Sequence, residues 1–317
     1  MLLFVNLRLF APVLAIMAVM AWGMAIKAAD NAVVVPGTKV SLEPPTGFSP
    51  SSQFPGFMDE DTLASIMVTE IPAPYADISG SMTPGALEQG GMALLESSQT
   101  TISGREGLLL HVTQRAGGVQ FEKWMALFGD DVQTVMVVGT YPQESAPTLS
   151  EPIRLAVLSS EWDLTRNPGL FDGLTFRIEE TETLKFARRL SNMLLLTRNG
   201  QQGQVAPQDP FAVVGASISE VEIADLAAFS RQRLESTAQL ENVSEVEGHQ
   251  VTVDGMEAYE LVANAVEGRS HTPLRVYQLV ALHDRNYFLV QGFVGADQGD
   301  SFLTEFRQLG ESLTHAE

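Results

Sequence analysis

The chain has no cysteine among its 317 residues. It therefore forms no disulfide, offers no thiolate to a metal and has no cysteine nucleophile. A lipid anchor attached through an N-terminal cysteine is excluded for the same reason. Because disulfides are absent, an exported protein of this length must be stabilised by its hydrophobic cores.

Basic residues are scarce as well. Lys and Arg number 19 against 39 Asp and Glu, so the formal net charge is −20. Both halves of the chain are acidic, which argues against binding to nucleic acid or to anionic lipid surfaces. Solubility is the simplest explanation of this acidity, and a cationic partner is allowed but not required.

Charge is almost absent from a stretch near the N-terminus. An apolar run from Phe10 to Ile26 follows Arg8 and ends at Lys27. This arrangement is typical of a secretory signal. The run is slightly shorter than the ~20 residues that span a bilayer, so an uncleaved anchor is the alternative. We predict that residues 1–29 are a signal peptide or signal anchor and that the rest is periplasmic or secreted. Any membrane contact is expected through this segment alone, if it is not cleaved.

The middle of the chain is repeated near its end. Gly104-Arg105-Glu106-Gly107 precedes an aromatic strand with Trp124, and Gly255-Met256-Glu257-Ala258 precedes a similar strand with Tyr277. A repeat of about 150 residues indicates two copies of one globular unit. The segment Arg166–Gly169 breaks the periodicity between them. We therefore predict one domain over residues 30–165 and a second over residues 166–317.

Each half shows the same order of expected elements. Three strands, Gly107–Thr113, Phe121–Phe128 and Val132–Tyr141, are separated by short Gly and Asp turns, which is typical of antiparallel hairpins. A helix before them is predicted by Thr83 with Pro84 in the first half, and by Ser219 with Glu222 in the second.

The apolar face of that earlier helix in the first half is expected to include Leu87, Met92, Leu94 and Leu95. Each half is expected to close with a further helix. Its apolar face contains Leu155, Leu158 and Trp162 in the first half, and Phe302, Phe306, Leu309 and Leu313 in the second, with Asp300 as its cap. The fold class is therefore α+β: two tandem antiparallel-sheet α/β/α sandwich domains, related by internal duplication, after the N-terminal segment.

These features resemble PsbP-like α/β/α sandwich domains, once in each half. The resemblance is carried by Gly47-Phe48, by the Gly-x-Glu-Gly/Ala turns, and by the stretches Leu174–Phe176 and Met193–Thr197. It implies a binding or assembly role in exported bacterial proteins and supplies no catalytic residues. The first half departs from the pattern at the proline-rich Pro44–Pro55, so the two openings are expected to differ in shape.

Motifs for chemistry are mostly missing. The 5 histidines have no metal-ligand spacing. The nucleophile elbow Gly-x-Ser-x-Gly is absent, since Ser219 stands where the second glycine of Gly215-Ala216-Ser217 should be. No phosphate-binding loop is present. We therefore predict no catalytic, cofactor-binding or metal-binding residues and no cofactor.

One group of cations stands out in the acidic chain: Lys185, Arg188, Arg189 and Arg198. The stretch Leu184–Leu190 that holds most of them fits either a helix or a strand. The cations are expected to pair with acids of the first half and set the domain interface, or to bind an acidic ligand.

The sequence favours a non-enzymatic, exported binding or assembly protein of the bacterial cell envelope. Its partner is an unknown envelope protein or a small ligand. The alternative is a hydrolase with an active site in a cleft between the domains, where ligand pockets tend to form. A cleft in which Ser, His and an acid converge would distinguish the two.

Overall fold

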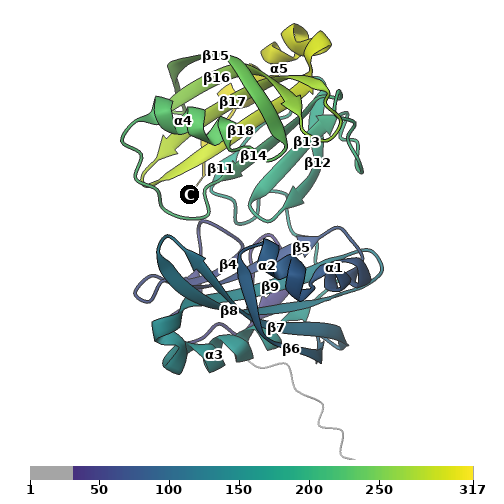
Figure 1. The fold of residues 1–317 in the computed structure, drawn as a ribbon, viewed down its shortest axis with the longest axis vertical. Coiled ribbons are helices and arrows are strands. Elements are labelled where there is room, and N and C mark those ends of the chain that lie inside the picture. Colours follow the sequence, from purple (N-terminus) through teal and green to yellow (C-terminus); the bar gives the residue numbers. More distant parts are fainter. Residues whose placement is uncertain (1–30, 317) are drawn as a thin grey trace, which may run out of the picture. The chain divides into compact units, whose positions relative to one another are not determined.

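The computed structural model describes residues 31–316, and from Ala32 onward these form one compact unit. The predicted signal or anchor segment, residues 1–29, lies outside the described residues. Two large antiparallel sheets of seven strands each dominate the fold (Figure 1). The first is built from residues before the Arg166–Gly169 segment and the second from residues after it.

The first sheet has the strand order β3-β4-β5-β9-β8-β7-β6. Its strands are β3 (Ser49–Pro50), β4 (Gly56–Asp59), β5 (Ala64–Ile71), β6 (Met92–Ile102), β7 (Arg105–Ala116), β8 (Val119–Gly129) and β9 (Thr134–Pro142). The second sheet has the order β12-β13-β14-β18-β17-β16-β15. Its strands are β12 (Leu184–Leu190), β13 (Met193–Arg198), β14 (Phe211–Ala216), β15 (Leu240–Val253), β16 (Met256–Glu267), β17 (Pro273–His283) and β18 (Asn286–Gly295).

The two sheets thus share one strand order, and the expected equivalent residues occupy equivalent places. Trp124 pairs across the sheet with Gly139, and Tyr277 pairs with Gly292. Gly104 lies in the β6–β7 turn with φ 70°, and Gly255 lies in the β15–β16 turn with φ 75°. Each is preceded by another residue of positive φ, which is the geometry of the tight hairpin turn that favours glycine.

Short strands accompany the large sheets. They are β1 (Val33–Val34), β2 (Val40–Leu42) and β10 (Glu161–Trp162) in the first half, and β11 (Phe176–Arg177) and β19 (Thr314–His315) in the second. In each half, the short strand after the last helix pairs with a short strand from the beginning of that half. The ends of each half are therefore joined by hydrogen bonds.

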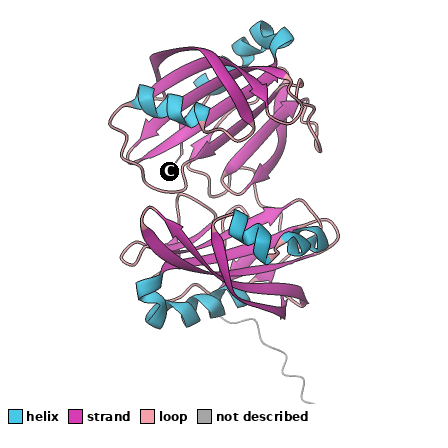
Figure 2. Cartoon of the chain, viewed as in Figure 1, coloured by secondary structure: helices cyan, strands magenta, loops and turns pink. Residues whose placement is uncertain are grey.

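Helices lie on both faces of each sheet (Figure 2). In the first half these are α1 (Tyr75–Ser81) and α2 (Pro84–Gln89) on one face and α3 (Ala146–Leu158), preceded by the 3₁₀ turn η1 (Gln143–Ser145), on the other. In the second half α4 (Leu226–Glu235) covers one face, and α5 (Gly299–Glu311), preceded by η2 (Ala296–Gln298), covers the other. The structure thus has an α+β half on each side of the Arg166–Gly169 segment.

A glycine under a helix recurs in both cores. A Cβ on Gly139 would lie 2.1 Å from Cγ2 of Ile153, and a Cβ on Gly292 would lie 2.4 Å from Cδ1 of Phe306. Ile153 and Phe306 are fully buried residues of α3 and α5. Each glycine therefore lets the following helix approach the sheet closely.

Several predicted elements are wrong in detail. Met92, Leu94 and Leu95 belong to β6 rather than to a helix, because α2 ends at Gln89. Helix α4 begins after Asp225, whose side chain accepts a hydrogen bond from the Ala228 N–H, and not at Ser219. Strands β6 and β15 carry mostly polar, exposed side chains, so they lack the apolar alternation that reveals a strand.

The closing helices also differ from expectation. In α3 the buried residues are Ile153, Ala156 and Val157, whereas Leu155 is 55% exposed. Trp162 lies beyond that helix, in β10. Asp300 lies inside the first turn of α5 and does not cap it, since the N-cap position is Gln298. The Thr83 cap is confirmed, because its hydroxyl accepts a hydrogen bond from the Ala86 N–H.

Candidate functional site

The four cations singled out in the sequence do not form one cluster. Lys185, Arg188 and Arg189 lie on β12, so the ambiguous stretch is a strand. Lys185 pairs with Glu180 at 3.6 Å. Arg198, at the end of β13, donates to Oε1 of Gln298 at 3.1 Å and lies over the ring of Phe302. The partners of Lys185 and Arg198 therefore belong to the second half.

Arg189 binds backbone carbonyls at the start of the second half. Its guanidinium donates to the carbonyl oxygens of Ser191, Leu170 and Asp172 at 2.7, 3.1 and 2.6 Å. Burial lowers the pKa of this guanidinium, and the carboxylates of Asp172 and Glu70 oppose that effect. Arg189 therefore ties the segment after Arg166–Gly169 to the β12–β13 hairpin.

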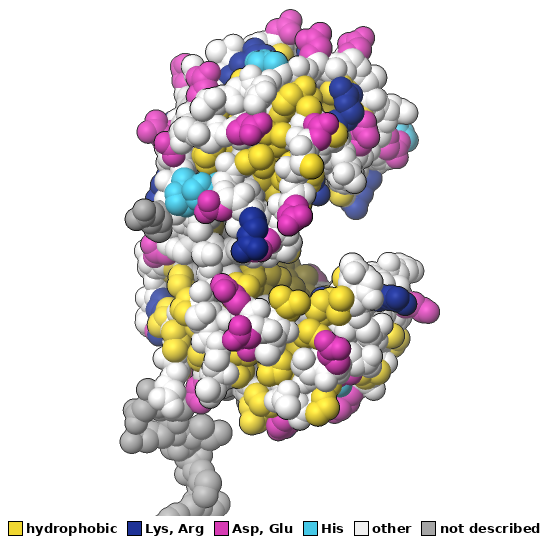
Figure 3. Space-filling view, turned by 90° about the vertical axis from the view of Figure 1, so that its left-hand side faces the viewer, with side chains coloured by type: hydrophobic (Ala, Val, Ile, Leu, Met, Phe, Trp, Pro, Cys, Tyr) yellow, Lys and Arg dark blue, Asp and Glu magenta, His cyan; other side chains and the backbone are white. Residues whose placement is uncertain are grey.

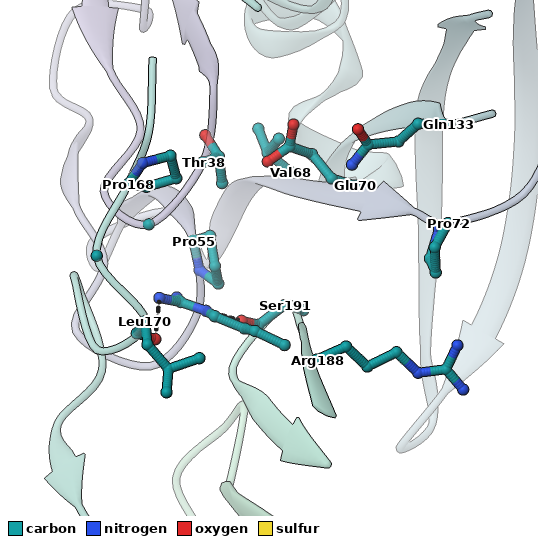
Figure 4. A pocket seen from close by; sticks show the side chains of 13 residues that line it. Thr38, Pro55, Val68, Glu70, Pro72, Gln133, Pro168, Leu170, Arg188 and Ser191 are labelled. Carbon is teal, nitrogen blue, oxygen red and sulfur yellow. Dashed lines mark hydrogen bonds between the residues drawn. The ribbon is translucent and has the colours of Figure 1, made fainter. Parts of the chain in front are cut away.

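Arg188 and Arg189 line a small pocket, which we call the linker pocket (Figure 4). Its volume is about 230 Å³, and its lining residues are Gly37, Thr38, Pro55, Val68, Glu70, Pro72, Gln133, Pro168, Gly169, Leu170, Arg188, Arg189 and Ser191. In Figure 4 the guanidinium of Arg188 points away from Leu170. Glu70 already accepts hydrogen bonds from the Trp162 indole and the Lys39 N–H. The pocket is smaller than the ~300–1,000 Å³ usual for ligand sites.

A larger pocket, the hairpin pocket, has a volume of about 390 Å³. Its lining residues are Met67, Thr69, Leu190, Ser191, Asn192, Met193, Val213, Gly215, Ala216, Ser217, Ile218, Arg233, Tyr287 and Leu289. All belong to the second half except Met67 and Thr69 of β5. The pocket is built on the β12–β13 turn, on β14 and β18, and on the last turn of α4.

Strand alternation explains why this pocket is apolar. Leu194, Leu196, Ala212 and Val214 point into the core beneath α5, so the intervening side chains lie on the opposite face of the sheet. Helix α4 packs on that face against residues of β16, β17 and β18. Over β13 and β14 the face is left open. Three apolar side chains at or beside these strands are exposed: Leu190 at the end of β12 (36%), Met193 of β13 (40%) and Ile218 just after β14 (56%).

Two polar side chains of the hairpin pocket, Asn192 and Ser217, are engaged within the protein. The Asn192 amide donates to the carbonyls of Gln53 and Ala216. The Ser217 hydroxyl donates to Asn286 and accepts from the Tyr287 N–H. Arg233 is the one charged residue of the lining, and its buried Nε has no hydrogen-bond partner. The pocket is therefore suited to an apolar group rather than to acid–base chemistry.

The electrostatics of the surface set this pocket apart. Acidic side chains are scattered over the face shown in Figure 3 and do not form one patch. The hairpin pocket, by contrast, has no carboxylate among its lining residues. Arg233, the one cation of this lining, therefore has no carboxylate beside it among the lining residues.

A network of hydrogen bonds in the first half includes a histidine, His111, next to a carboxylate, Glu122. Nε2 of His111 lies 3.0 Å from Oε2 of Glu122 and 3.2 Å from the Tyr141 hydroxyl. That hydroxyl donates to Oγ of Ser150 at 2.8 Å, and the Trp124 indole donates to the same oxygen.

Burial raises the pKa of Tyr141 to about 12, and the Glu122 carboxylate adds to that increase although the hydrogen bond to Ser150 opposes it. The His111 ring is stacked on Trp124 with centroids 4.0 Å apart. Neither the linker pocket nor the hairpin pocket is lined by these residues. The network joins the sheet to α3 and lies outside both pockets.

Sequence reasoning missed the hairpin pocket. The available signal was the run Met193–Leu196 together with Phe211–Ile218, in which both faces of a strand are apolar although the opposite face is only partly covered. Within residues 31–316, no three His, Asp or Glu side chains converge so as to hold a metal ion. In the same part of the chain, no helix has the length and hydropathy needed to cross a membrane.

Comparisons with known proteins find similarity in structure alone. No family model matches, and no curated protein matches. LpqN of Mycobacterium tuberculosis, involved in cell envelope biogenesis, is 14% identical, with 45% of this chain and 83% of LpqN covered and a TM-score of 0.34. Cyanobacterial PsbP from Synechocystis is 12% identical over 48% of this chain and 98% of that protein, with a TM-score of 0.26.

The T6SS immunity protein TplEi of Pseudomonas aeruginosa is 11% identical, with 84% of this chain and 96% of TplEi covered and a TM-score of 0.32. At such identities and TM-scores, these similarities assign this chain to no family and carry no argument about its function.

Proposed function

We propose that this chain is a non-enzymatic binding protein of the bacterial cell envelope and that it binds its ligand or partner in the hairpin pocket. The observation that carries the proposal is the uncovered apolar face over β13 and β14, where Met193 of β13 and Ile218, just after β14, are exposed. Exposed apolar side chains gathered around a concavity are typical of interaction sites.

The hydrolase alternative is less well supported. It requires a serine, a histidine and an acid to converge in a cleft between the two halves. The linker pocket brings Ser191 and Glu70 together, but no histidine lines it. His111 has its carboxylate partner, yet that pair is partly buried on the sheet, against Trp124 and Tyr141, and lines neither pocket. Its position favours a structural role.

The location in the envelope rests on the apolar N-terminal segment and on the resemblance of the sequence to PsbP-like domains. Mass spectrometry of the exported protein should find a new N-terminus between Ile26 and Asp30. An intact Met1 in the membrane fraction would instead indicate an anchor. The two predicted domains, residues 30–165 and 166–317, are part of the same proposal.

Photocrosslinking tests the binding role directly. A benzoylphenylalanine placed at Met193, inside the pocket, should form a covalent adduct in the cell that produces the protein. The same residue at Val119 is the matched control, because Val119 is 43% exposed at the start of β8 and lies outside the pocket. Equal labelling at both positions, or none at Met193, would contradict the proposed function.

A further inference from the structure

Most of the backbone around the hairpin pocket belongs to interior strands. Of the strands that line it, β13, β14 and β18 each have a neighbouring strand on both sides within the second sheet, whereas β12, which contributes Leu190, is the edge strand. A peptide lying over β13 and β14 could therefore not extend the sheet there, which is the usual way an extended segment binds to strands. A peptide bound across the face would leave its own N–H and C=O groups without protein partners.

The side chains that line the pocket also favour an apolar occupant over a peptide. The Asn192 amide donates hydrogen bonds to the carbonyls of Gln53 and Ala216, and the Ser217 hydroxyl donates to Asn286. An occupant of the pocket meets Met193 and its apolar neighbours over most of the pocket surface. A volume of about 390 Å³ lies near the lower end of the usual range for ligand sites, which suits one acyl chain better than two.

Arg233 supplies the polar end of the site. It lies in the last turn of α4, where a helix terminus favours a cation. Its Nε is buried and has no hydrogen-bond partner, and among the described residues no carboxylate lies within ion-pair distance of it. Other arginines of this acidic chain do have such partners: Arg154, Arg166, Arg285 and Arg307.

We propose that the hairpin pocket binds a single-chain amphiphile with a carboxylate head, a fatty acid, whose chain lies on the open face of β13 and β14 and whose head pairs with Arg233. The proposal rests on the proposed binding function and specifies its ligand. A guanidinium matches a carboxylate in geometry and can offer two parallel N–H groups to it. A carboxylate in the pocket would give the Arg233 guanidinium the anionic partner that it lacks among the described residues.

Displacement of a fluorescent fatty acid from the full chain tests this pairing. The competitors are dodecanoate, the neutral dodecanol and the cationic dodecyltrimethylammonium, which share one chain length. Dodecanoate should bind at least about tenfold more tightly than dodecanol, which corresponds to about 1.4 kcal/mol. Dodecyltrimethylammonium should be the weakest of the three, because its head would face Arg233.

Two sets of variants locate the site. All are made in the full chain, so any binding of amphiphile by the N-terminal segment contributes equally to every measurement. Arg233→Gln should reduce dodecanoate binding to the level of dodecanol and leave dodecanol unchanged. Arg231→Gln removes the same charge from an exposed position of α4 and should change neither. Met193→Glu should weaken dodecanoate binding, whereas Met193→Lys should not, and circular dichroism should show that all four variants fold.

The outcomes separate the two proposals. Equal affinity for dodecanol and dodecanoate, or an Arg233→Gln variant that binds dodecanoate as before, overturns the fatty-acid site. If no amphiphile binds but the adduct at Met193 is a polypeptide, the ligand class is wrong and the binding function stands. If no amphiphile binds and Met193 forms no adduct, both proposals fail.

Discussion

The close contact between Gly292 and the α5 helix leads to a quantitative prediction. A Cβ on Gly292 would lie 2.4 to 2.6 Å from three ring atoms of Phe306, and the ring is fully buried, so it cannot swing into solvent. We expect Gly292→Ala to lower the free energy of unfolding by about 1–3 kcal/mol through overpacking. Phe306→Ala should lower it by about 3–5 kcal/mol, because it removes a buried ring and leaves a cavity.

The double variant should be more stable than the sum of these effects predicts, since the new methyl group then enters the space that the ring has left. We expect a favourable coupling of about 1–3 kcal/mol, measured by urea denaturation with far-UV circular dichroism. Gly139→Ala combined with Phe306→Ala is the matched control, because the Gly139 Cβ would meet Ile153 instead. Additive effects of Gly292→Ala and Phe306→Ala would refute the packing argument.

Three further predictions concern single side chains. Burial raises the pKa of Glu305, but hydrogen bonds from Thr181 and the loop after it outweigh this and hold that pKa below its usual range. The folded state therefore gains stability from Glu305 above the unfolded pKa, so Glu305→Gln should destabilise near neutral pH and its effect should vanish in acid. His111→Gln should fold, lose about 1–3 kcal/mol of stability because Glu122 loses a buried partner, and retain dodecanoate binding. Thr83→Ala should cost about 0.5–2 kcal/mol through the lost helix cap.

Each of these has an outcome that counts against it. A Glu305→Gln variant whose loss of stability is the same at neutral and acidic pH would contradict the assigned pKa direction. A folded His111→Gln protein that no longer binds dodecanoate or forms the adduct at Met193 would favour a functional role for the histidine. Thr83→Ser keeps the capping oxygen and should retain most of the stability, and a loss equal to that of Thr83→Ala would argue against the cap.

Parts of the fold could be predicted because they depend on local patterns. Strands β7, β8 and β9 have runs of apolar residues bounded by glycine and aspartate turns, and each lies close to its expected range. Strands β6 and β15 could not be found in this way. Their exposed side chains carry no alternation, and they form because each pairs with its neighbour through a tight glycine turn.

The candidate site could likewise be predicted from the sequence only in part. The sequence singled out Arg188, Arg189 and two further cations by their charge in an acidic chain, yet the partners of Arg189 depend on where distant backbone carbonyls lie. It passed over Arg233, which looks like an ordinary surface cation of a helix. Its importance comes from the pocket beside it and from a buried Nε without a partner.

The sequence by itself determined the repeated order of strands, the tight turns at Gly104 and Gly255, and the acidity of both halves, because these follow from residue type and spacing along the chain. Only the tertiary structure decided that α4 leaves the face over β13 and β14 open and brings Arg233 to its edge. That outcome depends on where a helix packs across strands distant in sequence, and coverage of a sheet face is a property of packed elements that no local pattern encodes.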